Sequence, residues 1–326
     1  MSKKEITLSD GARKVLDCGN MVPGENVLIV TDTAQPLSIA QALYRAAAEA
    51  GACPLLVTME PVPPAGDLPA PLNEALKTAD LVITPTSTSL YHSKGIRDAI
   101  TKPAKARVIA LSEITEDAMT HGGILADFKG LKPLVEKLAG YYDKGEKIHY
   151  MTPSGTDLKA SIAGRPSYWI SGVADQPGML LALPTTEVYI APVEDTVEGT
   201  IVVDASCSGG VGLVDEPIRI TVEHGKIVKI EGGTAAGKLR DKLEGVGDPN
   251  ACQIAEFGLG LNPECRVIGT TEDEGRYGTC HIGIGSNVGF GGCNDVPIHL
   301  DVIMWHPTIT IDDEPIFEKG ESLIQV

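Results

Sequence analysis

Residues 273–301 read DEGRYGTCHIGIGSNVGFGGCNDVPIHLD, and this stretch organises the prediction of the whole fold. It contains two histidines, His281 and His299, and a carboxylate, Asp301, two residues beyond the second histidine. On a strand, alternation would send His299 and Asp301 to one face and Leu300 to the other. Zinc, iron, manganese and cobalt accept such a mixture of imidazole nitrogen and carboxylate oxygen. The stretch therefore predicts a metal site, with glycines that let the backbone turn and approach closely.

Each of these residues, taken alone, could also have a purely structural role. A histidine in an apolar strand can be a hydrogen-bonded core residue, and a His-x-Asp pair can be a simple hydrogen bond. Glycine-rich runs commonly form turns. The metal interpretation therefore depends on further ligand-type residues from other segments of the chain.

Composition limits the classes of protein to which the chain can belong. A length of 326 residues predicts two domains. The formal net charge of −17 argues against a nucleic-acid partner, which would require basic patches. No run of about eighteen apolar residues occurs, and the N-terminal stretch has no apolar segment, so we expect neither a membrane span nor a signal peptide. The seven cysteines show no CxxC spacing, which favours free thiols in a cytoplasmic protein.

The first half of the chain alternates between strand-like and helix-like patterns. Short apolar runs predict strands at 26–31, 53–59, 81–84 and 106–110. Helical patterns occupy 5–22, 37–50, 72–79, 93–100 and 127–142. This alternation predicts a parallel sheet with flanking helices. Residues 32–35, DTAQ, stand where a GxGxxG fingerprint would follow the first strand, so a nicotinamide dinucleotide is disfavoured.

The pattern changes near residue 147. Short β-type runs separated by Gly, Pro and Asp follow, with a hairpin turn near 223–225 and one helix near 236–244. We therefore predict an α/β domain over residues 1–146 and an α+β domain rich in antiparallel strands over residues 147–326.

Two glutamates are further candidates for the site. Glu187 enters a strand between Pro184 and Pro192, where it could be either a ligand or an exposed charge at a strand edge. Glu256 lies in a glycine-rich, otherwise apolar run, and a carboxylate there is costly unless it is paired or bound to a cation. Glu256 is for this reason the more informative of the two.

Other polar residues have weaker claims. His92 follows the third predicted strand, where groups face the ligand crevice of a parallel sheet, so it could be an acid or base or only a neighbour of a helix cap. Cys280 precedes His281 on a strand, so the two should face opposite ways, which argues against a cysteine nucleophile. Asp273 and Glu274 could be partners that support His281 or simply a loop charge pair, and the loop charge pair is the favoured interpretation. Glu194 is interpreted as part of a solvated acidic turn.

The ordered set of ligand-type residues resembles the thermophilic aminopeptidase T family of dinuclear metallo-aminopeptidases. The resemblance covers residues 180–320 and lies in four segments, PTTE (184–187), AE (255–256), GTCHIGIG (278–285) and the run 291–301, which ends in HLD. It implies the metal ligands Glu187, Glu256, His281, His299 and Asp301. The chain departs from the family at Val288. The family has a catalytic tyrosine at this position, seven residues after the histidine that corresponds to His281.

The chain also resembles a shorter relative, the iron-dependent 2,5-dihydroxypyridine 5,6-dioxygenases. Total length, the His92-Ser93 segment and the His299-Leu-Asp301 segment are similar. In that enzyme a histidine stands where this chain has Glu256, so the ligand set is closer to the hydrolases while the size is closer to the dioxygenases.

Two functions follow from these resemblances. The first is a cytoplasmic metallohydrolase that cleaves an amide bond in a peptide or small cyclic amide, with two zinc, cobalt or manganese ions per chain activating water. Glu256 or His92 would move the proton. The alternative is a mononuclear Fe(II) dioxygenase that opens a hydroxylated pyridine-like ring, its triad being His299, Asp301 and either His281 or Glu256. In either case the resemblance implies a homodimer or higher homo-oligomer.

Overall fold

A computed structural model describes residues 6–63, 66–91, 93–101 and 105–326 of the chain. The chain forms two compact units, and each contains two separate segments. The first unit comprises Met1–Lys129 and Gly172–Pro184, and the second comprises Gly130–Ser171 and Thr185–Val326. A single division at residue 147 remains a prediction.

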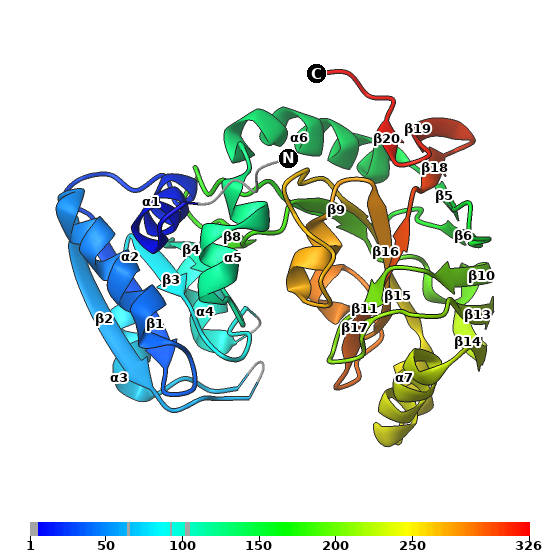
Figure 1. Ribbon diagram of the computed structural model, residues 1–326, viewed down its shortest axis with the longest axis horizontal. Helices are drawn as coiled ribbons and strands as arrows, with labels where there is room; N and C mark the ends of the chain where they lie inside the picture. Colours follow the sequence, from blue (N-terminus) through cyan, green and yellow to red (C-terminus); the bar gives the residue numbers. More distant parts are fainter. Residues whose placement is uncertain (1–5, 64–65, 92, 102–104) are drawn as a thin grey trace. The chain divides into compact units, whose positions relative to one another are not determined.

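The first unit contains a five-stranded parallel sheet in the order β2-β1-β3-β4-β8 (Figure 1). Its strands are β1 (Asn26–Asp32), β2 (Cys53–Met59), β3 (Leu81–Thr84), β4 (Arg107–Ala110) and β8 (Leu180–Ala182). Its helices are α1 (Leu8–Cys18), α2 (Leu37–Glu49), α3 (Ala70–Leu76), α4 (Lys94–Thr101) and α5 (Glu116–Thr120), with the 3-10 turn η1 (Gly122–Leu125). The predicted parallel sheet with flanking helices is thus confirmed.

Strand burial explains why this sheet forms. Every residue of β3 and β4 is buried, as expected for parallel strands that are covered on both faces. On one face, Leu72 and Leu76 of α3 join a cluster with Leu28 of β1 and Val82 of β3. Strand β8 was not predicted, because only three residues form it and they lie far along the chain from the other strands.

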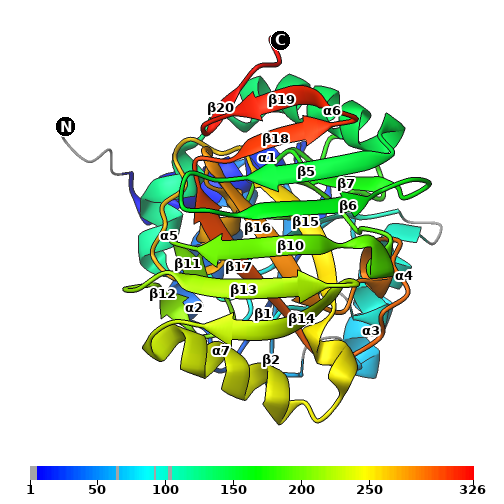
Figure 2. The same cartoon turned by 90° about the vertical axis from the view of Figure 1, so that its right-hand side faces the viewer.

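The second unit contains two antiparallel sheets. The eight-stranded sheet has the order β14-β13-β10-β6-β5-β18-β19-β20, and Figure 2 shows it face on. Its strands are β5 (Lys147–Met151), β6 (Asp157–Ser161), β10 (Glu198–Val203), β13 (Ile218–Glu223), β14 (Lys226–Glu231), β18 (Thr308–Ile311), β19 (Glu314–Glu318) and β20 (Glu321–Ser322). The predicted C-terminal region rich in antiparallel strands is confirmed.

The seven-stranded sheet has the order β12-β11-β17-β16-β15-β9-β7. Its strands are β7 (Ser167–Ile170), β9 (Glu187–Ile190), β11 (Ser206–Cys207), β12 (Gly212–Leu213), β15 (Ile254–Gly260), β16 (Thr279–Gly285) and β17 (His299–Trp305). The unit also contains helix α7 (Thr234–Gly245), most of α6 (Phe128–Lys144) and the 3-10 turns η2 (Glu194–Thr196), η3 (Pro249–Cys252), η4 (Thr271–Gly275) and η5 (Val288–Phe290).

The two sheets share one hydrophobic core. Buried side chains of the eight-stranded sheet, such as Ile148 and Ile201, belong to the same cluster as Phe257, Ile282 and Val302 of the seven-stranded sheet. This packing is that of a β-sandwich, in which each sheet directs alternate side chains inward. The other face of the seven-stranded sheet is therefore free to carry polar residues. Within the described part of the chain, no helix is both long and apolar enough to cross a membrane.

Candidate metal centre

The five candidate ligands meet on the second face of the seven-stranded sheet. His281 Nε2 lies 3.2 Å from Glu256 Oε1 and 3.4 Å from Glu187 Oε2. His299 Nε2 lies 3.5 Å from Glu256 Oε2 and 3.4 Å from Asp301 Oδ1. Glu256 therefore contacts both histidines, one with each carboxylate oxygen. These contacts join residues from four neighbouring strands, β9, β15, β16 and β17.

Strand register explains how residues so far apart in the sequence come together. In the antiparallel pairing, Gly283 of β16 lies opposite Glu256 on one side and Asp301 on the other. Gly258 of β15 lies opposite His281. Residues that pair directly across strands present their side chains on the same face. Each glycine therefore lies among the candidate ligands and on their face of the sheet.

The glycines of the site face make room for the ligand side chains. A Cβ added at Gly258 would lie 1.8 Å from His281 Nε2, and one at Gly283 would lie 2.6 Å from Glu256 Cβ and 2.9 Å from His299 Cε1. Any side chain at these two positions would push the imidazoles away. Gly258 and Gly283 thus serve side-chain clearance and not backbone turning.

His299 is held so that one ring nitrogen points at the carboxylates. Its Nδ1–H donates to the Ser286 carbonyl oxygen at 2.8 Å, which leaves Nε2 toward Glu256 and Asp301. This is the arrangement that orients an imidazole as a metal ligand. The ligand atoms of Glu256, His299 and Asp301 all lie within 4.8 Å of one another, close enough for one cation to bind all three.

Unsatisfied polar atoms provide a test of whether a cation fits. Glu187 Oε2, Asp301 Oδ1 and His281 Nδ1 are buried and have no hydrogen-bond partner among the described residues. Leaving such atoms unpaired is costly, and buried carboxylates are normally paired or bound to metal. A divalent cation bound by Glu256, His299 and Asp301 would satisfy the Asp301 oxygen, so the donor set fits a metal ion.

The electrostatics of the metal-free site point the same way. Burial raises the pKa of Glu187 to about 8, with Glu256 and Asp301 adding to the shift and His281 opposing it. Burial alone would lower the pKa of His281, but its hydrogen bond to Glu256 and the charge of Glu187 raise it to about 9. For His299, partial desolvation likewise opposes the charged form, but the negative charge of Asp301 outweighs it and raises the pKa to about 10. Without a metal, protons must compensate the clustered carboxylates.

Glu274 belongs to the same cluster, and the prediction of a loop charge pair was wrong for it. Burial raises the pKa of Glu274 well above its ordinary value, and the charges of Asp301, Glu187 and Glu256 raise it further. Its side chain also hydrogen-bonds Asp301. Asp273, in contrast, accepts hydrogen bonds from backbone N–H groups of its own loop.

A sequence signal could have separated these two acids. Thr270 and Asp273 form a capping box, in which each side chain accepts a hydrogen bond from the backbone of the other residue. The T-x-x-D pattern of residues 270–273 is visible in the sequence and assigns Asp273 to backbone capping. The pattern assigns no such capping role to the adjacent Glu274, which would have made it a candidate for the site.

Glu194 was also misjudged as a solvated residue. Its carboxylate is paired with Arg165, and it accepts hydrogen bonds from Asn287 Nδ2 at 3.2 Å and from the Cys293 backbone N–H at 2.8 Å. Arg165 also donates to the carbonyl oxygen of Gly291. Glu194 and Arg165 therefore fasten the loop between β16 and β17 to the body of the unit.

Three other predicted positions have different outcomes. Cys280 is buried in the hydrophobic core on the face opposite His281, and burial raises the pKa of its thiol, as expected of a residue that is not a nucleophile. His92 lies outside the described residues. Val288 is half exposed in η5, the short turn that also carries Phe290, and the Phe290 ring lies edge-on to His299 with centroids 5.8 Å apart.

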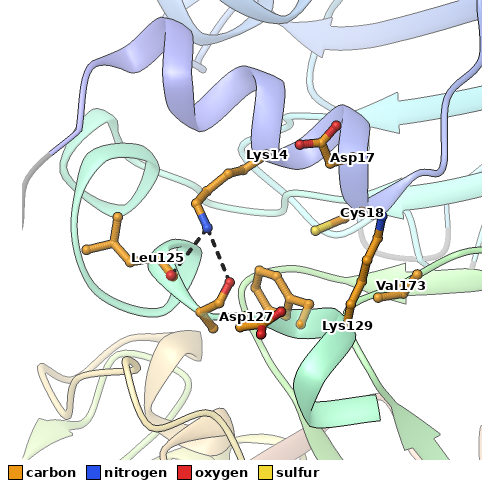
Figure 3. Close-up of a pocket in the computed structure, with 9 residues that line it drawn as sticks. Lys14, Asp17, Cys18, Leu125, Asp127, Lys129 and Val173 are labelled. Atoms are coloured by element: carbon orange, nitrogen blue, oxygen red, sulfur yellow. Dashed lines mark hydrogen bonds between the residues drawn. The ribbon is translucent and has the colours of Figure 1, made fainter.

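The first unit contains a cavity of about 350 Å³ that includes none of the predicted site residues (Figure 3). Its lining combines charged side chains of both signs, among them Lys14 and Asp17. The Lys14 amine is already used, because it donates to the carbonyl oxygens of Leu125 and Ala126, each at 3.2 Å. Burial raises the pKa of Cys18 to about 12, so its thiol is not activated.

The sequence model of the 2,5-dihydroxypyridine 5,6-dioxygenase family matches residues 7–324. A curated 2,5-dihydroxypyridine 5,6-dioxygenase of Pseudomonas putida is 29% identical over 193 residues, covering 55% of this chain and 54% of the relative. The matched region thus spans about half the length of that relative.

Two solved structures share the fold. That of 2,5-dihydroxypyridine dioxygenase from Pseudomonas putida KT2440 aligns with a TM-score of 0.85 and 22% identity, covering 98% of this chain and 97% of that one. That of wild-type AmpT from Thermus thermophilus aligns with a TM-score of 0.68 and 17% identity, covering 97% and 99%. At these identities the likeness concerns the fold alone.

Proposed function

Because the chain belongs to the 2,5-dihydroxypyridine 5,6-dioxygenase family, we propose that it is a metal-dependent dioxygenase that opens a hydroxylated pyridine-type ring. The observation that carries the proposal is the cluster of Glu256, His299 and Asp301, whose ligand atoms lie within 4.8 Å of one another on the site face. The set that suits a ferrous ion is two histidines and one carboxylate, and His281, whose Nε2 lies 3.2 Å from Glu256 Oε1, would supply the second imidazole beside His299.

The family corrects the first of the two predicted functions. The prediction of an amide-cleaving hydrolase, with its metallopeptidase and aminopeptidase assignments, is wrong, because the family match and the curated relative are dioxygenases. The relationship to aminopeptidase T is one of fold. The ring-opening alternative is therefore the function carried forward.

The overall reaction needs only the ring and dioxygen. Both oxygen atoms enter the product as one ring bond breaks, so no external electron donor is required. A ferrous ion would supply the electron density that lets ground-state dioxygen react with an aromatic molecule. We propose one such ion per chain rather than two zinc, cobalt or manganese ions, since a single cation can reach Glu256, His299 and Asp301 together.

The residues of the chain would hold and orient this site. His299 is fixed by Ser286, and Asp301 is fixed through its backbone N–H, which donates to Ser208 Oγ at 2.7 Å. His281 contacts Glu256 and Glu187 and would keep Glu256 turned toward the metal. Glu274, through its hydrogen bond to Asp301, would do the same for that carboxylate. His92 remains a proposed acid or base.

The test combines metal analysis with oxygen uptake. Protein purified without chelator should contain one iron per chain and consume one dioxygen for each 2,5-dihydroxypyridine that disappears. Chelation should abolish uptake, and Fe(II) but not Zn(II) should restore it. Two zinc, cobalt or manganese ions per chain without oxygen uptake would contradict the proposal. A homodimer or higher homo-oligomer and a cytoplasmic location remain predictions.

A further inference from the structure

Aromatic side chains gather beside His299. Only 4% of the chain is aromatic, yet Tyr168, Tyr189 and Phe290 form one cluster, which we call the aromatic wall. The rings of Tyr168 and Tyr189 are stacked, with centroids 5.9 Å apart and planes inclined by 25°. Phe290 lies edge-on to Tyr189 at 5.5 Å and to His299 at 5.8 Å. Ring contacts thus run without interruption from the edge of the sheet to the candidate metal ligands.

The wall is on the same sheet face as the site. Tyr189 is two residues from Glu187 on β9, so both side chains point the same way. Tyr168 of β7 pairs directly with Tyr189, and Tyr189 pairs with Gly258, which in turn pairs with His281. The His281 ring occupies the space that a side chain at Gly258 would fill, so the row continues from Tyr189 to His281.

Exposure distinguishes this cluster from ordinary core packing. Tyr168 is 37% exposed on an edge strand and Tyr189 is half-buried, whereas Phe290 is buried. The side chain of His299 is 32% exposed. A cluster built only for stability would bury its rings fully against the core, as Phe257 and Tyr150 do. Here, Tyr168 and Tyr189 keep exposed surface in a cluster whose third ring, Phe290, contacts His299.

Hydrogen bonds on both sides of Phe290 hold the loop that carries it. Glu194 accepts hydrogen bonds from Asn287 and from the backbone N–H of Cys293, on the two sides of Phe290 in the sequence. Asn287 Oδ1 also accepts a hydrogen bond from the Asn294 backbone N–H at 2.8 Å. The position of Phe290 against His299 is therefore set before any ligand arrives, which lowers the cost of ordering it on binding.

We infer that Tyr168, Tyr189 and Phe290 form a stacking surface that selects a planar aromatic ring and holds it beside Glu256, His299 and Asp301. This inference rests on the proposed function and sharpens it, because it assigns substrate selection to residues outside the metal ligands. Flat rings stack on aromatic side chains in offset or edge-to-face arrangements, whereas puckered rings fit such a surface poorly. The wall would thus select substrates by the shape of their ring, while the metal ligands would determine which reaction takes place.

Binding without turnover tests the inference directly. The iron-loaded protein is titrated with 2,5-dihydroxypyridine in the absence of oxygen, and with a saturated six-membered ring that carries the same hydroxyl groups. Tyr168→Leu, at the exposed end of the wall, should raise the Kd for the planar ring about tenfold. Its Kd for the saturated ring should stay unchanged. Phe290→Leu should have an effect of the same sign.

Matched variants separate stacking from structural support. Tyr168→Phe keeps the ring and should bind like the wild type, and Tyr44→Leu makes the same change at an exposed tyrosine of α2 and should also have no effect. An unchanged Kd in both Tyr168→Leu and Phe290→Leu, with iron content retained, would overturn the inference. So would a loss of affinity that follows loss of iron in every wall variant.

The two proposals can fail separately. Suppose that wild-type protein binds the planar ring through the wall but consumes no oxygen with it. This result would contradict the proposed reaction and support the stacking surface. If Tyr168→Leu and Tyr189→Leu convert the ring with an unchanged KM, the result would support the reaction and contradict the role of the aromatic wall in binding.

Discussion

The two faces of the seven-stranded sheet carry opposite kinds of residue, although the same strands build both. One face of β15, β16 and β17 presents Phe257, Ile282 and Val302 to the core. The other presents Glu256, His281, His299 and Asp301, separated by glycines. Alternation thus lets neighbouring residues serve stability and chemistry separately. A change on one face should alter folding, and a change on the other should alter metal binding and turnover.

The largest effect is expected on the site face, from Asp301→Asn. The substitution keeps the shape but removes the negative charge that faces His299, so metal affinity should collapse. We expect turnover to fall by about 1,000-fold or more, because several kcal/mol of metal-derived stabilisation disappear. Thermal unfolding should still show a cooperative transition. An iron content and oxygen uptake equal to the wild type would contradict the assignment of Asp301 to the site.

Phe257→Ala tests the opposite face one residue away from Glu256. Phe257 is fully buried and lies edge-on to Tyr150 with ring centroids 5.1 Å apart. Its truncation should lower the free energy of unfolding by about 3–5 kcal/mol. Iron bound per folded molecule should change little at a temperature where the variant is folded. Denaturant unfolding together with metal analysis checks this, and an unchanged stability combined with lost iron would break the comparison.

Gly283→Ala adds a methyl group among the candidate ligands on the site face of the sheet. The new Cβ would lie 2.6 Å from Glu256 Cβ and 2.9 Å from His299 Cε1, so the ligands must shift. A displacement of about 1 Å at a reacting centre costs on the order of 100-fold in rate, and we expect a loss of that size in kcat. Steady-state kinetics on the iron-loaded variant provides the measurement.

Gly140→Ala is the matched control for that substitution. Gly140 lies inside α6, where an added Cβ meets nothing within 4 Å. The control should be slightly more stable, by about 0.5–1 kcal/mol, and fully active. Equal kinetics in the two alanine variants would mean that the clearance provided by Gly283 is not needed.

The smallest effect concerns pH and distinguishes metal-free from metal-loaded protein. In the metal-free site the pKa values of Glu187, His281 and His299 are raised to about 8, 9 and 10. The folded state therefore binds more protons than the unfolded state between the ordinary and the raised values, so stability falls as pH rises through that window. The free energy of unfolding of the metal-free protein should therefore fall from pH ~6 to ~10.

Bound metal should remove this pH dependence, because it takes the place of the protons. Urea unfolding of chelated and iron-loaded protein across the same pH range provides the measurement. Curves that run parallel for the two forms would show that these groups do not bind the metal.

Much of the site could be predicted from the sequence, since the evidence is local. His299 and Asp301 are two residues apart, so the alternation of a single strand fixes their common face. Glu256 was identified because a carboxylate in an apolar run needs a partner. His281 was identified in the same glycine-rich stretch and Glu187 at the start of a strand, and the resemblance to known families assigned both to the same metal site.

The rest depends on pairing between strands, which the sequence does not state. That Gly258 lies opposite both Tyr189 and His281 is a matter of register, so neither its clearance role nor the aromatic wall was predicted. Glu274 was paired in the prediction with the acid beside it, although its partner is Asp301 in a distant strand. Charged neighbours in sequence proved a poor guide to charged neighbours in space.

Strand β8 has a consequence for how the protein is made. It is the edge strand beside β4 in the first unit, yet Gly130–Ser171, which belong to the second unit, leave the ribosome before it. A nascent chain that has reached Lys129 therefore lacks the strand that covers the β4 edge. Such uncovered edges invite pairing with other chains. The first unit thus has to wait for part of the second to be synthesised, and chaperone demand should be greatest during that interval.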